Sequence, residues 1–328
     1  MNIGTVLVTG ANGFLGKTIL SQLLRENLTV CGTDMVSTSA AIGIAYKKAD
    51  ITRPEELFDV IGSVATVIHA AGLAHIFDKS NAINAPFKAI NEQGTANVAR
   101  AAAEVGVRHF ILISSVSVYG SFTQGVYDEN APCCPEGPYA ESKYQAEQRA
   151  IEIAKASGMA LTILRLATLY GEGDPGNVAR LMRAVDRGRF IWIGNGSNCK
   201  SLLHREDAAW ACLLAAQRPA AGVNVYNVSG PPCTMCEVVD GLAGALGKRI
   251  PPFGIPAALV RQISELFSIL PVSRLQNLGA TAQKWLADDV VDGSKFAQVF
   301  NFQARVNLAE GLRREVAWYR AEQAKRGT

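Results

Sequence analysis

The stretch "TGANGFLG" (residues 9–16) follows a short apolar run and places glycines at positions 10, 13 and 16. This GxxGxxG spacing is typical of the turn that joins the first strand to the first helix of a dinucleotide-binding unit. Glycine permits a tight turn, close approach of the backbone to a pyrophosphate and close packing of helix on strand. The free N–H groups at the start of the helix favour an anion. We therefore predict that Gly10, Gly13 and Gly16 bind the pyrophosphate of a dinucleotide.

Asp34 indicates which dinucleotide binds. It ends the next apolar run, about 20 residues beyond the glycines, where a carboxylate can accept both ribose hydroxyls of an adenosine. The same charge would repel a 2′-phosphate, and no arginine follows, because the next residues are Met35 and Val36. The sequence therefore predicts NAD rather than NADP.

Around these motifs, apolar runs alternate with helical patterns. The runs cover residues 5–10, 28–34, 45–50, 66–72, 109–115 and 160–167. Repeated strand–helix units predict an α/β fold with a doubly wound parallel sheet. We expect residues 1–170 to form the NAD-binding core, with about 190–230 returning to it. Residues 171–328 are expected to form mainly a smaller substrate-binding lobe, in which 251–300 is the least regular stretch.

Capping-box spacing marks two helix starts. Thr52 and Glu55 show it in "TRPEELFDVI", and Thr234 and Glu237 show it in "CTMCEVV". The second pair overlaps a lone CxxC, Cys233 and Cys236. A metal or redox role for these cysteines would need a second pair or histidines nearby, and none is close in sequence. We therefore predict a helix start there and no metal site.

The composition is that of an ordinary globular protein. Of the 328 residues, 48% are hydrophobic and 19% are charged. The net charge of +3 comes from 32 basic and 29 acidic residues without a basic run, which argues against a nucleic-acid partner. No uncharged apolar stretch reaches about 18 residues, so we expect no membrane span. The odd count of seven cysteines favours free thiols, and with the absence of a leader pattern it predicts a cytoplasmic protein.

The stretch "PYAESKYQAE" (138–147) predicts a helix that begins at Pro138, since proline suits the first helical position. Tyr139 and Lys143 are four residues apart and share one face of that helix, whereas Tyr144 points elsewhere. Only Tyr139 and Lys143 can therefore act together.

Four motifs in this order carry a resemblance to a known family: "TGANGFLG", "HAAG" (69–72), "SSVSVYG" (114–120) and "YAESK" (139–143). The sequence resembles an extended short-chain dehydrogenase/reductase and, within that group, the NAD-dependent sugar epimerase/dehydratase family, which includes UDP-sugar 4-epimerases. The resemblance covers nearly the whole chain and is strongest through about residue 230. It implies that further residues line the NAD site: Phe14, Leu15, Asp50, Ile51, Ala70, Ala71, Gly72, Asn91, Lys143 and Ala167.

The chemistry expected of Tyr139 requires a shifted pKa. A phenol has a pKa of about 10, and lowering it to about 7 takes roughly 4 kcal/mol of preferential stabilisation of the phenolate. A helix N-terminus supplies at most about 2 kcal/mol. We expect Lys143 and the positive nicotinamide to supply the rest. Tyr139 would then take a proton from a substrate hydroxyl while hydride leaves the same carbon for NAD⁺, and Lys143 would also hold the nicotinamide ribose.

Ser115 is the third catalytic candidate. It matches the family's catalytic serine or threonine, four residues before the tyrosine of "VYG", and would hydrogen-bond the substrate oxygen. Relatives that eliminate water resemble Thr-Asp-Glu here, whereas this chain has Ser115, Val116 and Ser117. Valine cannot transfer a proton, which disfavours a 4,6-dehydratase.

Candidate substrate contacts come from the resemblance. They are Ser117, Thr168, Asn177 and Lys200. Lys200 stands where the epimerases usually carry an arginine that binds the diphosphate, and it is equally well read as a surface lysine. His204 and Asp207 resemble the family's H-x-x-D segment, and we expect this histidine to be structural.

The leading interpretation is a nucleotide-sugar 4-epimerase or a closely related 4-keto-sugar oxidoreductase that uses NAD. A 3β-hydroxysteroid dehydrogenase-like or ketone-reducing enzyme is the alternative, with the apolar stretch at 255–270 covering a hydrophobic ligand. A catalytically inactive NAD-binding sensor is a third. By resemblance, the helices near 86–105 and 139–157 would form a four-helix interface in a homodimer.

Overall fold

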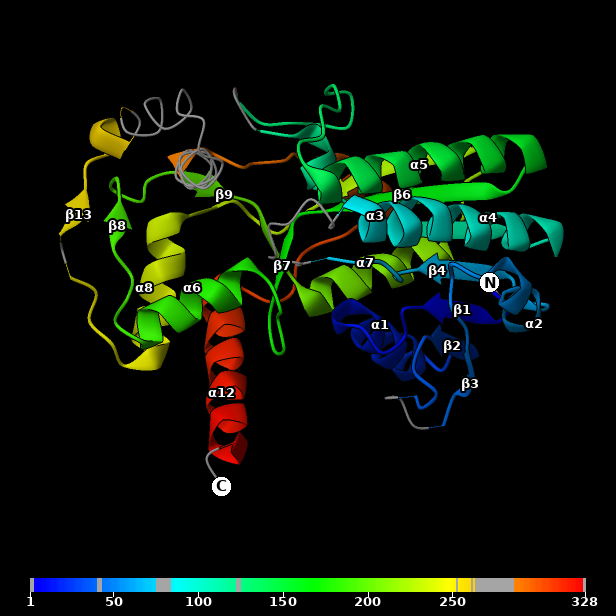
Figure 1. The fold of residues 1–328 in the computed structure, drawn as a ribbon, viewed down its shortest axis with the longest axis horizontal. Coiled ribbons are helices and arrows are strands. Elements are labelled where there is room, and N and C mark those ends of the chain that lie inside the picture. Colours follow the sequence, from blue (N-terminus) through cyan, green and yellow to red (C-terminus); the bar gives the residue numbers. More distant parts are fainter. Residues whose placement is uncertain are drawn as a thin grey trace.

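The computed structural model describes residues 3–39, 43–74, 84–121, 125–251, 253–260, 262 and 286–326. Within these residues, seven parallel strands form one sheet in the order β11-β6-β5-β4-β1-β2-β3 (Figure 1). Its strands are β1 (Val6–Thr9), β2 (Val30–Asp34), β3 (Ala45–Lys48), β4 (Thr66–His69), β5 (His109–Ser115), β6 (Ala160–Leu166) and β11 (Val223–Val228). The predicted doubly wound parallel sheet is confirmed, and each of the six apolar runs contains one strand.

Helices cover both faces of the sheet. On one face lie α1 (Phe14–Arg25) and α7 (Arg205–Gln217). On the other lie α2 (Phe58–Ile61), α4 (Thr95–Glu104) and α5 (Pro138–Ser157). Shorter segments lead into these helices: η1 (Pro54–Glu56), α3 (Asn84–Phe87), the π-helical η3 (Lys88–Gly94) and η4 (Val116–Tyr119).

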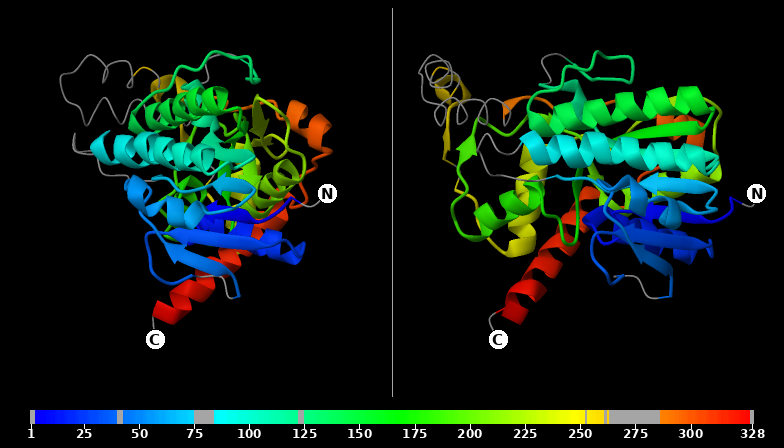
Figure 2. Two further views of the ribbon diagram at one scale, coloured as in Figure 1. Left: turned by 90° about the vertical axis from the view of Figure 1, so that its right-hand side faces the viewer. Right: turned by 45° about the vertical axis from the view of Figure 1, so that its right-hand side comes forward.

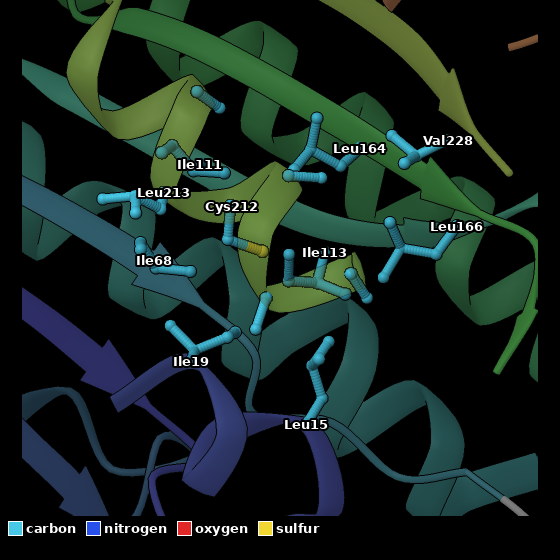
Figure 3. Packing of buried hydrophobic residues seen from close by; sticks show 14 of the residues in the cluster. Leu15, Ile19, Ile68, Ile111, Ile113, Leu164, Leu166, Cys212, Leu213 and Val228 are labelled. Atoms are coloured by element: carbon cyan, nitrogen blue, oxygen red, sulfur yellow. The ribbon is translucent and has the colours of Figure 1, made fainter. Parts of the chain in front are cut away.

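The strands are apolar on both sides because successive side chains enter different cores. Ile68, Ile111 and Ile113 face α1 and α7, where Figure 3 shows them near Leu15 and Ile19. Their sequence neighbours enter the core under α4 and α5: Val67, Phe110 and Leu112. This burial on two sides is why the strands are continuous hydrophobic runs in the sequence.

A third core belongs to the C-terminal part of the chain. It is built from α6 (Asn177–Asp186), α8 (Met235–Leu246) and α12 (Leu308–Arg326). Three small strand pairs accompany it: β7 (Thr168–Tyr170) with β10 (Leu202–His204), β9 (Cys199–Lys200) with β12 (Cys233–Thr234), and β8 (Trp192–Ile193) with β13 (Gly254–Ile255). Helix α11 (Ser294–Phe300) instead packs on β11, and α12 runs out to the C-terminus (Figure 2).

The two predicted capping boxes have different outcomes. Thr234 and Glu237 form the expected reciprocal pair at the start of α8. The prediction at Thr52 was wrong, because Arg53 precedes η1 without a side-chain cap. The hydroxyl of Thr52 instead donates to Asp50 Oδ1 at 2.7 Å within a tight turn.

Two further observations concern the chain as described. No helix within the described ranges is both long and apolar enough to cross a bilayer. Cys233 donates weakly to the Lys200 carbonyl, and Cys236 donates to the Asn195 carbonyl at 3.1 Å. Both thiols are free.

Candidate functional site

The glycine turn is closed by contacts that leave no room for side chains. A Cβ atom on Gly10 would lie 2.7 Å from the backbone of Ala71, and Gly10 has a φ of +67°. A Cβ atom on Gly16 would lie 2.0 Å from the Gly10 carbonyl oxygen. Gly13 precedes α1, and no side chain caps the helix there. The first N–H groups of α1 are therefore open to a pyrophosphate, which fits the dinucleotide site that the sequence predicts.

Asp34 lies at the end of β2 with its carboxylate held in place. Its Oδ2 accepts from the Asn12 N–H at 3.0 Å, and its Oδ1 accepts from the Met35 N–H at 2.7 Å. Asn12 in turn donates to the hydroxyl of Tyr46 at 3.0 Å. Because each carboxylate oxygen can accept a second hydrogen bond, Asp34 can still bind ribose hydroxyls.

The segment after β4 connects the glycine turn to the predicted catalytic helix. The Asn91 side chain accepts from the Leu73 N–H at 2.7 Å and donates to the Leu73 carbonyl at 3.0 Å. It also donates to Ser142 on α5 at 2.9 Å. A Cβ atom on Gly72 would lie 3.3 Å from Lys143 Nζ. Asn91 therefore holds the segment that follows the fourth strand, and Gly72 lies against Lys143.

A buried histidine fixes the strand ends beside this segment. His69 Nδ1 lies 2.7 Å from the Thr9 hydroxyl, and His69 Nε2 lies 3.0 Å from the Thr95 hydroxyl. Burial, aided by the charge of Lys143, lowers the pKa of His69 to about 3. The imidazole is therefore neutral and joins β1, β4 and α4. Sequence reasoning missed this role, although His69 lies within the "HAAG" motif.

The three catalytic candidates meet where β5 and α5 approach each other. Tyr139 lies in the first turn of α5, and the Ser115 side chain at the end of β5 is close enough to lower its pKa. Lys143, one turn later, donates to the Ile113 carbonyl oxygen at 2.9 Å. Burial lowers the pKa of Lys143 to about 8, and the negative charge of Glu147 opposes that shift.

The pKa of Tyr139 differs from the expectation. Burial raises it above the ordinary value for a phenol, and the neighbouring Ser115 side chain offsets only part of that rise. The Lys143 ammonium is bonded to the Ile113 carbonyl oxygen and does not lower the pKa of Tyr139. In the chain alone, desolvation of the phenolate therefore outweighs the stabilisation that we predicted.

Behind the three candidates lies a buried polar network that the sequence analysis missed. Arg165 donates to Glu147 through Nε at 3.0 Å and through Nη2 at 2.7 Å, and both side chains are nearly inaccessible. Ser114 donates to Glu147 at 2.5 Å. Arg165 also donates to the Tyr119 hydroxyl, which donates to Asn227 at 2.8 Å. The network thus ties α5 to β5, β6 and β11.

The short helix η4 contains Val116 and Ser117, and Ser115 immediately precedes it. The Ser115 hydroxyl accepts from the Ser117 N–H at 3.2 Å and caps this short helix, so its structural role accompanies the proposed catalytic one. The Ser117 hydroxyl is buried and has no hydrogen-bond partner among the described residues, which leaves it available to a substrate. Val116 is buried and brings no proton-transfer group.

The other predicted cofactor residues make contacts within the protein. Leu15 and Ile51 are buried in the two main cores, and Ala167 is buried with its N–H bonded to the Val228 carbonyl. Phe14 begins α1, and the Arg205 guanidinium lies 5.3 Å from its ring. Asp50 is half-buried and binds Thr52. Ala70 is half-buried between β4 and Ala71.

Among the described residues, no contact links the predicted substrate residues Thr168, Asn177 and Lys200 to Tyr139. Thr168 is half-buried on β7, and Asn177 is exposed at the start of α6. Lys200 Nζ donates to the Ala287 carbonyl oxygen at 2.8 Å, which is a structural contact. His204 caps α7 by accepting from the Glu206 N–H at 3.3 Å, in line with the structural role expected.

Comparison with known proteins places this geometry in a family. The model of the NAD dependent epimerase/dehydratase family matches residues 6–229. The UDP-glucose 4-epimerase of Vibrio cholerae is 29% identical over 272 residues, which cover 80% of this chain and 82% of that protein. The N-acetyl-alpha-D-glucosaminyl-diphospho-ditrans,octacis-undecaprenol 4-epimerase of Escherichia coli O157:H7 is 30% identical and covers 95% of this chain and 94% of that protein.

A solved structure has the same fold. MoeE5 in complex with UDP-glucose and NAD is 27% identical, with a TM-score of 0.78 over 98% of this chain and 100% of that chain. The cofactor of the family is NAD, in agreement with the glycine turn and with Asp34. The chain is thus an extended short-chain dehydrogenase/reductase, and it belongs to the NAD-dependent epimerase/dehydratase family.

Proposed function

We propose that the protein is an NAD-dependent 4-epimerase of a nucleotide sugar, or a closely related 4-keto-sugar oxidoreductase. The observation that carries the proposal is the placement of Ser115 beside Tyr139, one helical turn from Lys143, which itself lies against Gly72. An acid–base pair beside a dinucleotide groove suits the reversible oxidation of a secondary alcohol.

The chain's own residues divide the work. Gly10, Gly13 and Gly16 would hold the pyrophosphate, and Asp34 would hold the adenosine ribose. NAD, when bound, supplies the hydride acceptor. Tyr139 would take the proton of the substrate hydroxyl.

Two side chains assist Tyr139. Ser115 would donate a hydrogen bond to the substrate oxygen. Lys143 would stabilise the phenolate once its ammonium turns from the Ile113 carbonyl towards the ring. That reorientation would reverse the raised pKa of Tyr139 in the chain alone.

Dehydration is not part of the proposal. It needs an acid and a base on the carbons next to the ketone, and Val116 and Ser117 occupy those positions. Epimerisation and simple oxidation or reduction need neither group.

The test is a substrate panel. Purified protein is incubated with UDP-glucose, UDP-galactose and their N-acetyl forms, and the products are separated while NADH absorbance is followed. Interconversion without added NAD⁺ is the expected result. Absence of both interconversion and any change in absorbance would overturn the assignment of a nucleotide sugar.

A second candidate substrate is a sugar diphosphate carried on a polyprenyl chain. The relative from Escherichia coli O157:H7 is named for a substrate of that kind. The observation in this chain that favours it is an exposed apolar face at β8 and β13, described below. Both candidates undergo the same reaction at the sugar, so they differ only in the group attached to the diphosphate, a nucleoside or a polyprenyl chain.

The alternative functions, the homodimer and the cytoplasmic location are each tested by a separate measurement. The apolar stretch 255–270 invoked for a steroid- or ketone-reducing enzyme lies mostly outside the described residues, and turnover of lipid alcohols with added NAD⁺ would favour that alternative. An inactive NAD sensor would be favoured if Tyr139→Phe left every activity unchanged. The homodimer is tested by light scattering, and the cytoplasmic location by cell fractionation.

A further inference from the structure

The outer edge of the C-terminal lobe carries a two-stranded sheet with two different faces. Strands β8 and β13 run parallel, with Trp192 opposite Gly254 and Ile193 opposite Ile255 (Figure 1). Alternate residues of a strand point to opposite faces. Trp192 and Gly254 therefore share the inner face, and Ile193 and Ile255 share the outer one.

The inner face is partly packed against the lobe. The Trp192 ring lies 5.0 Å from the Phe190 ring in an edge-to-face arrangement. A Cβ atom on Gly254 would lie 2.6 Å from the Trp192 Cβ, and one on Gly196 would lie 2.6 Å from the Trp192 ring. The lobe therefore covers this side around Trp192, which is half-buried, while Gly254 stays exposed.

The outer face is apolar and exposed. Phe253 is 80% exposed, Ile191 is 62% exposed and Ile255 is 40% exposed. Phe253 and Ile191 immediately precede the paired residues and so lie beside each other. Leu259, in the following helical turn, is 46% exposed. Large apolar side chains grouped in this way usually mark a surface that contacts something other than water.

Basic side chains flank this apolar face. Arg187 and Arg189 are exposed between α6 and β8, and Lys248 and Arg249 are exposed between α8 and β13. The Lys248 ammonium lies 4.0 Å from Asp186, which neutralises part of this charge. The surface therefore combines apolar anchors with a positive border.

We propose that this face docks on an anionic lipid membrane. Aromatic and aliphatic side chains enter the boundary between headgroups and acyl chains, while lysine and arginine bind anionic headgroups. A second copy of the chain fits less well, because a symmetric contact would bring the four basic residues of each copy together. A two-residue strand pair is also small beside the roughly 800 Å² per partner of a stable interface.

Docking places the lobe of the enzyme at the surface from which a lipid-borne substrate is drawn. The docking itself does not depend on the proposed function. Only the use of a polyprenyl-linked sugar rests on it, whereas the vesicle experiments below test the docking alone.

The first test is flotation of the full-length protein with vesicles. We expect the protein to float with vesicles of phosphatidylcholine and phosphatidylglycerol, and to float less with phosphatidylcholine alone or at high salt. Changing Ile191→Ser together with Phe253→Ser should lower the bound fraction about tenfold, since both apolar anchors are lost. Val299→Ser is the matched control, because Val299 is 49% exposed on α11, away from this sheet.

The second test removes the charge. Lys248→Gln with Arg249→Gln should weaken binding to the anionic vesicles about tenfold, whereas Arg313→Gln on α12 should leave it unchanged. Turnover of UDP-sugars in solution should stay the same in all four proteins. Thermal unfolding and retained NAD establish that each variant is folded.

Three results would overturn the proposal. Wild-type protein that stays unbound at low salt contradicts it, and so does full binding by the double serine variant. If light scattering shows that the wild type is an oligomer and the double serine variant is a monomer, the face would be assigned to self-association instead.

Discussion

Glu147 and Arg165 are bonded at two points, with Nε to Oε1 at 3.0 Å and Nη2 to Oε2 at 2.7 Å, in a place that water scarcely reaches. Glu147 follows Lys143 by one helical turn, and Tyr139 precedes Lys143 by one. The same helix face therefore carries the proposed base, the cation and the carboxylate that anchors them to β6.

Replacing Glu147 should change the pH dependence of the enzyme. Glu147 and His69 interact electrostatically with Lys143, and of the two the charge of Glu147 opposes the lowering of the Lys143 pKa by burial. In Glu147→Gln that pKa should fall below about 8, so the alkaline limb of kcat/KM should move down by roughly one pH unit.

The matched control is a carboxylate of η3 that binds an arginine of α5. Arg149 contacts Glu92 at 3.3 Å towards the solvent, and Glu92→Gln should leave the alkaline limb in place. Glu147→Gln should also destabilise the fold by about 3 kcal/mol, because Arg165 is left buried and unpaired. A folded Glu147→Gln enzyme with the wild-type profile would show that Glu147 serves structure alone.

Removing the phenol hydroxyl should separate chemistry from cofactor binding. Tyr139→Phe should lower kcat by about 10²–10⁴-fold, since a positioned base contributes about that much. Bound NAD, measured after denaturation, should be unchanged. Tyr144→Phe, in the same helix but on another face, should keep wild-type kcat. Equal effects in the two variants would be incompatible with a catalytic Tyr139.

Stability should fall as the pH rises, because of Glu315. This carboxyl on α12 is fully buried, its Oε1 lacks a partner among the described residues, and burial raises its pKa from 4.5 to about 8. A raised pKa adds stability below pH 4.5 that is lost as the pH rises through about 8. Urea unfolding should show a loss on the order of a few kcal/mol over this range.

Glu315→Gln should flatten that pH dependence and should unfold at higher urea than wild type near pH 8. Glu310→Gln, at a half-exposed position of the same helix, should behave like wild type. A wild-type slope in Glu315→Gln would assign the pH dependence to other groups.

Gly16→Ala should abolish NAD binding. The added Cβ atom would lie 2.0 Å from the Gly10 carbonyl oxygen, so the turn must open. We expect a loss of stability of about 1–3 kcal/mol and no retained NAD. Gly244→Ala is the control, because a Cβ atom there meets nothing within 4 Å and alanine favours the helix. Thermal unfolding and a fluorescence titration with NADH measure both.

Asp34→Ser should relax the choice between the two nicotinamide cofactors. Removing the carboxylate removes two ribose hydrogen bonds and the repulsion of a 2′-phosphate. We expect the ratio of Kd values, NADP over NAD, to fall at least tenfold, measured by calorimetry. Glu26→Gln, at the exposed end of α1, should leave the ratio unchanged. An unaltered ratio in Asp34→Ser would place the ribose elsewhere.

Local chemistry explains what the sequence could predict. Two-sided burial made β1 and β5 continuous apolar runs, and Pro138 and Thr234 each carry a start signal that acts within one helical turn. The Gly10 turn is likewise local. These features depend on neighbours in the chain, so the residues alone reveal them.

Contacts between residues that are far apart in the sequence could not be predicted from it. Arg165 meets Glu147 only because β6 and α5 are adjacent in the fold, and β8 meets β13 across some 60 residues of loosely patterned chain. Thr52 had the spacing of a capping residue, but its hydroxyl donates to the Asp50 carboxylate instead. The spacing of Glu147 from Lys143 was a usable signal, since residues at i and i+4 share a helix face.

The pairing of β6 with β11 has a consequence for synthesis of the chain. Among the described residues, the outer edge of β6 is paired with residues 222–228, which a ribosome makes after the whole of β7, α6 and α7. Until then, a long apolar edge stays open to neighbouring nascent chains. Truncation before Val223 should therefore yield aggregates, and overproduction should improve with slower translation or added chaperones.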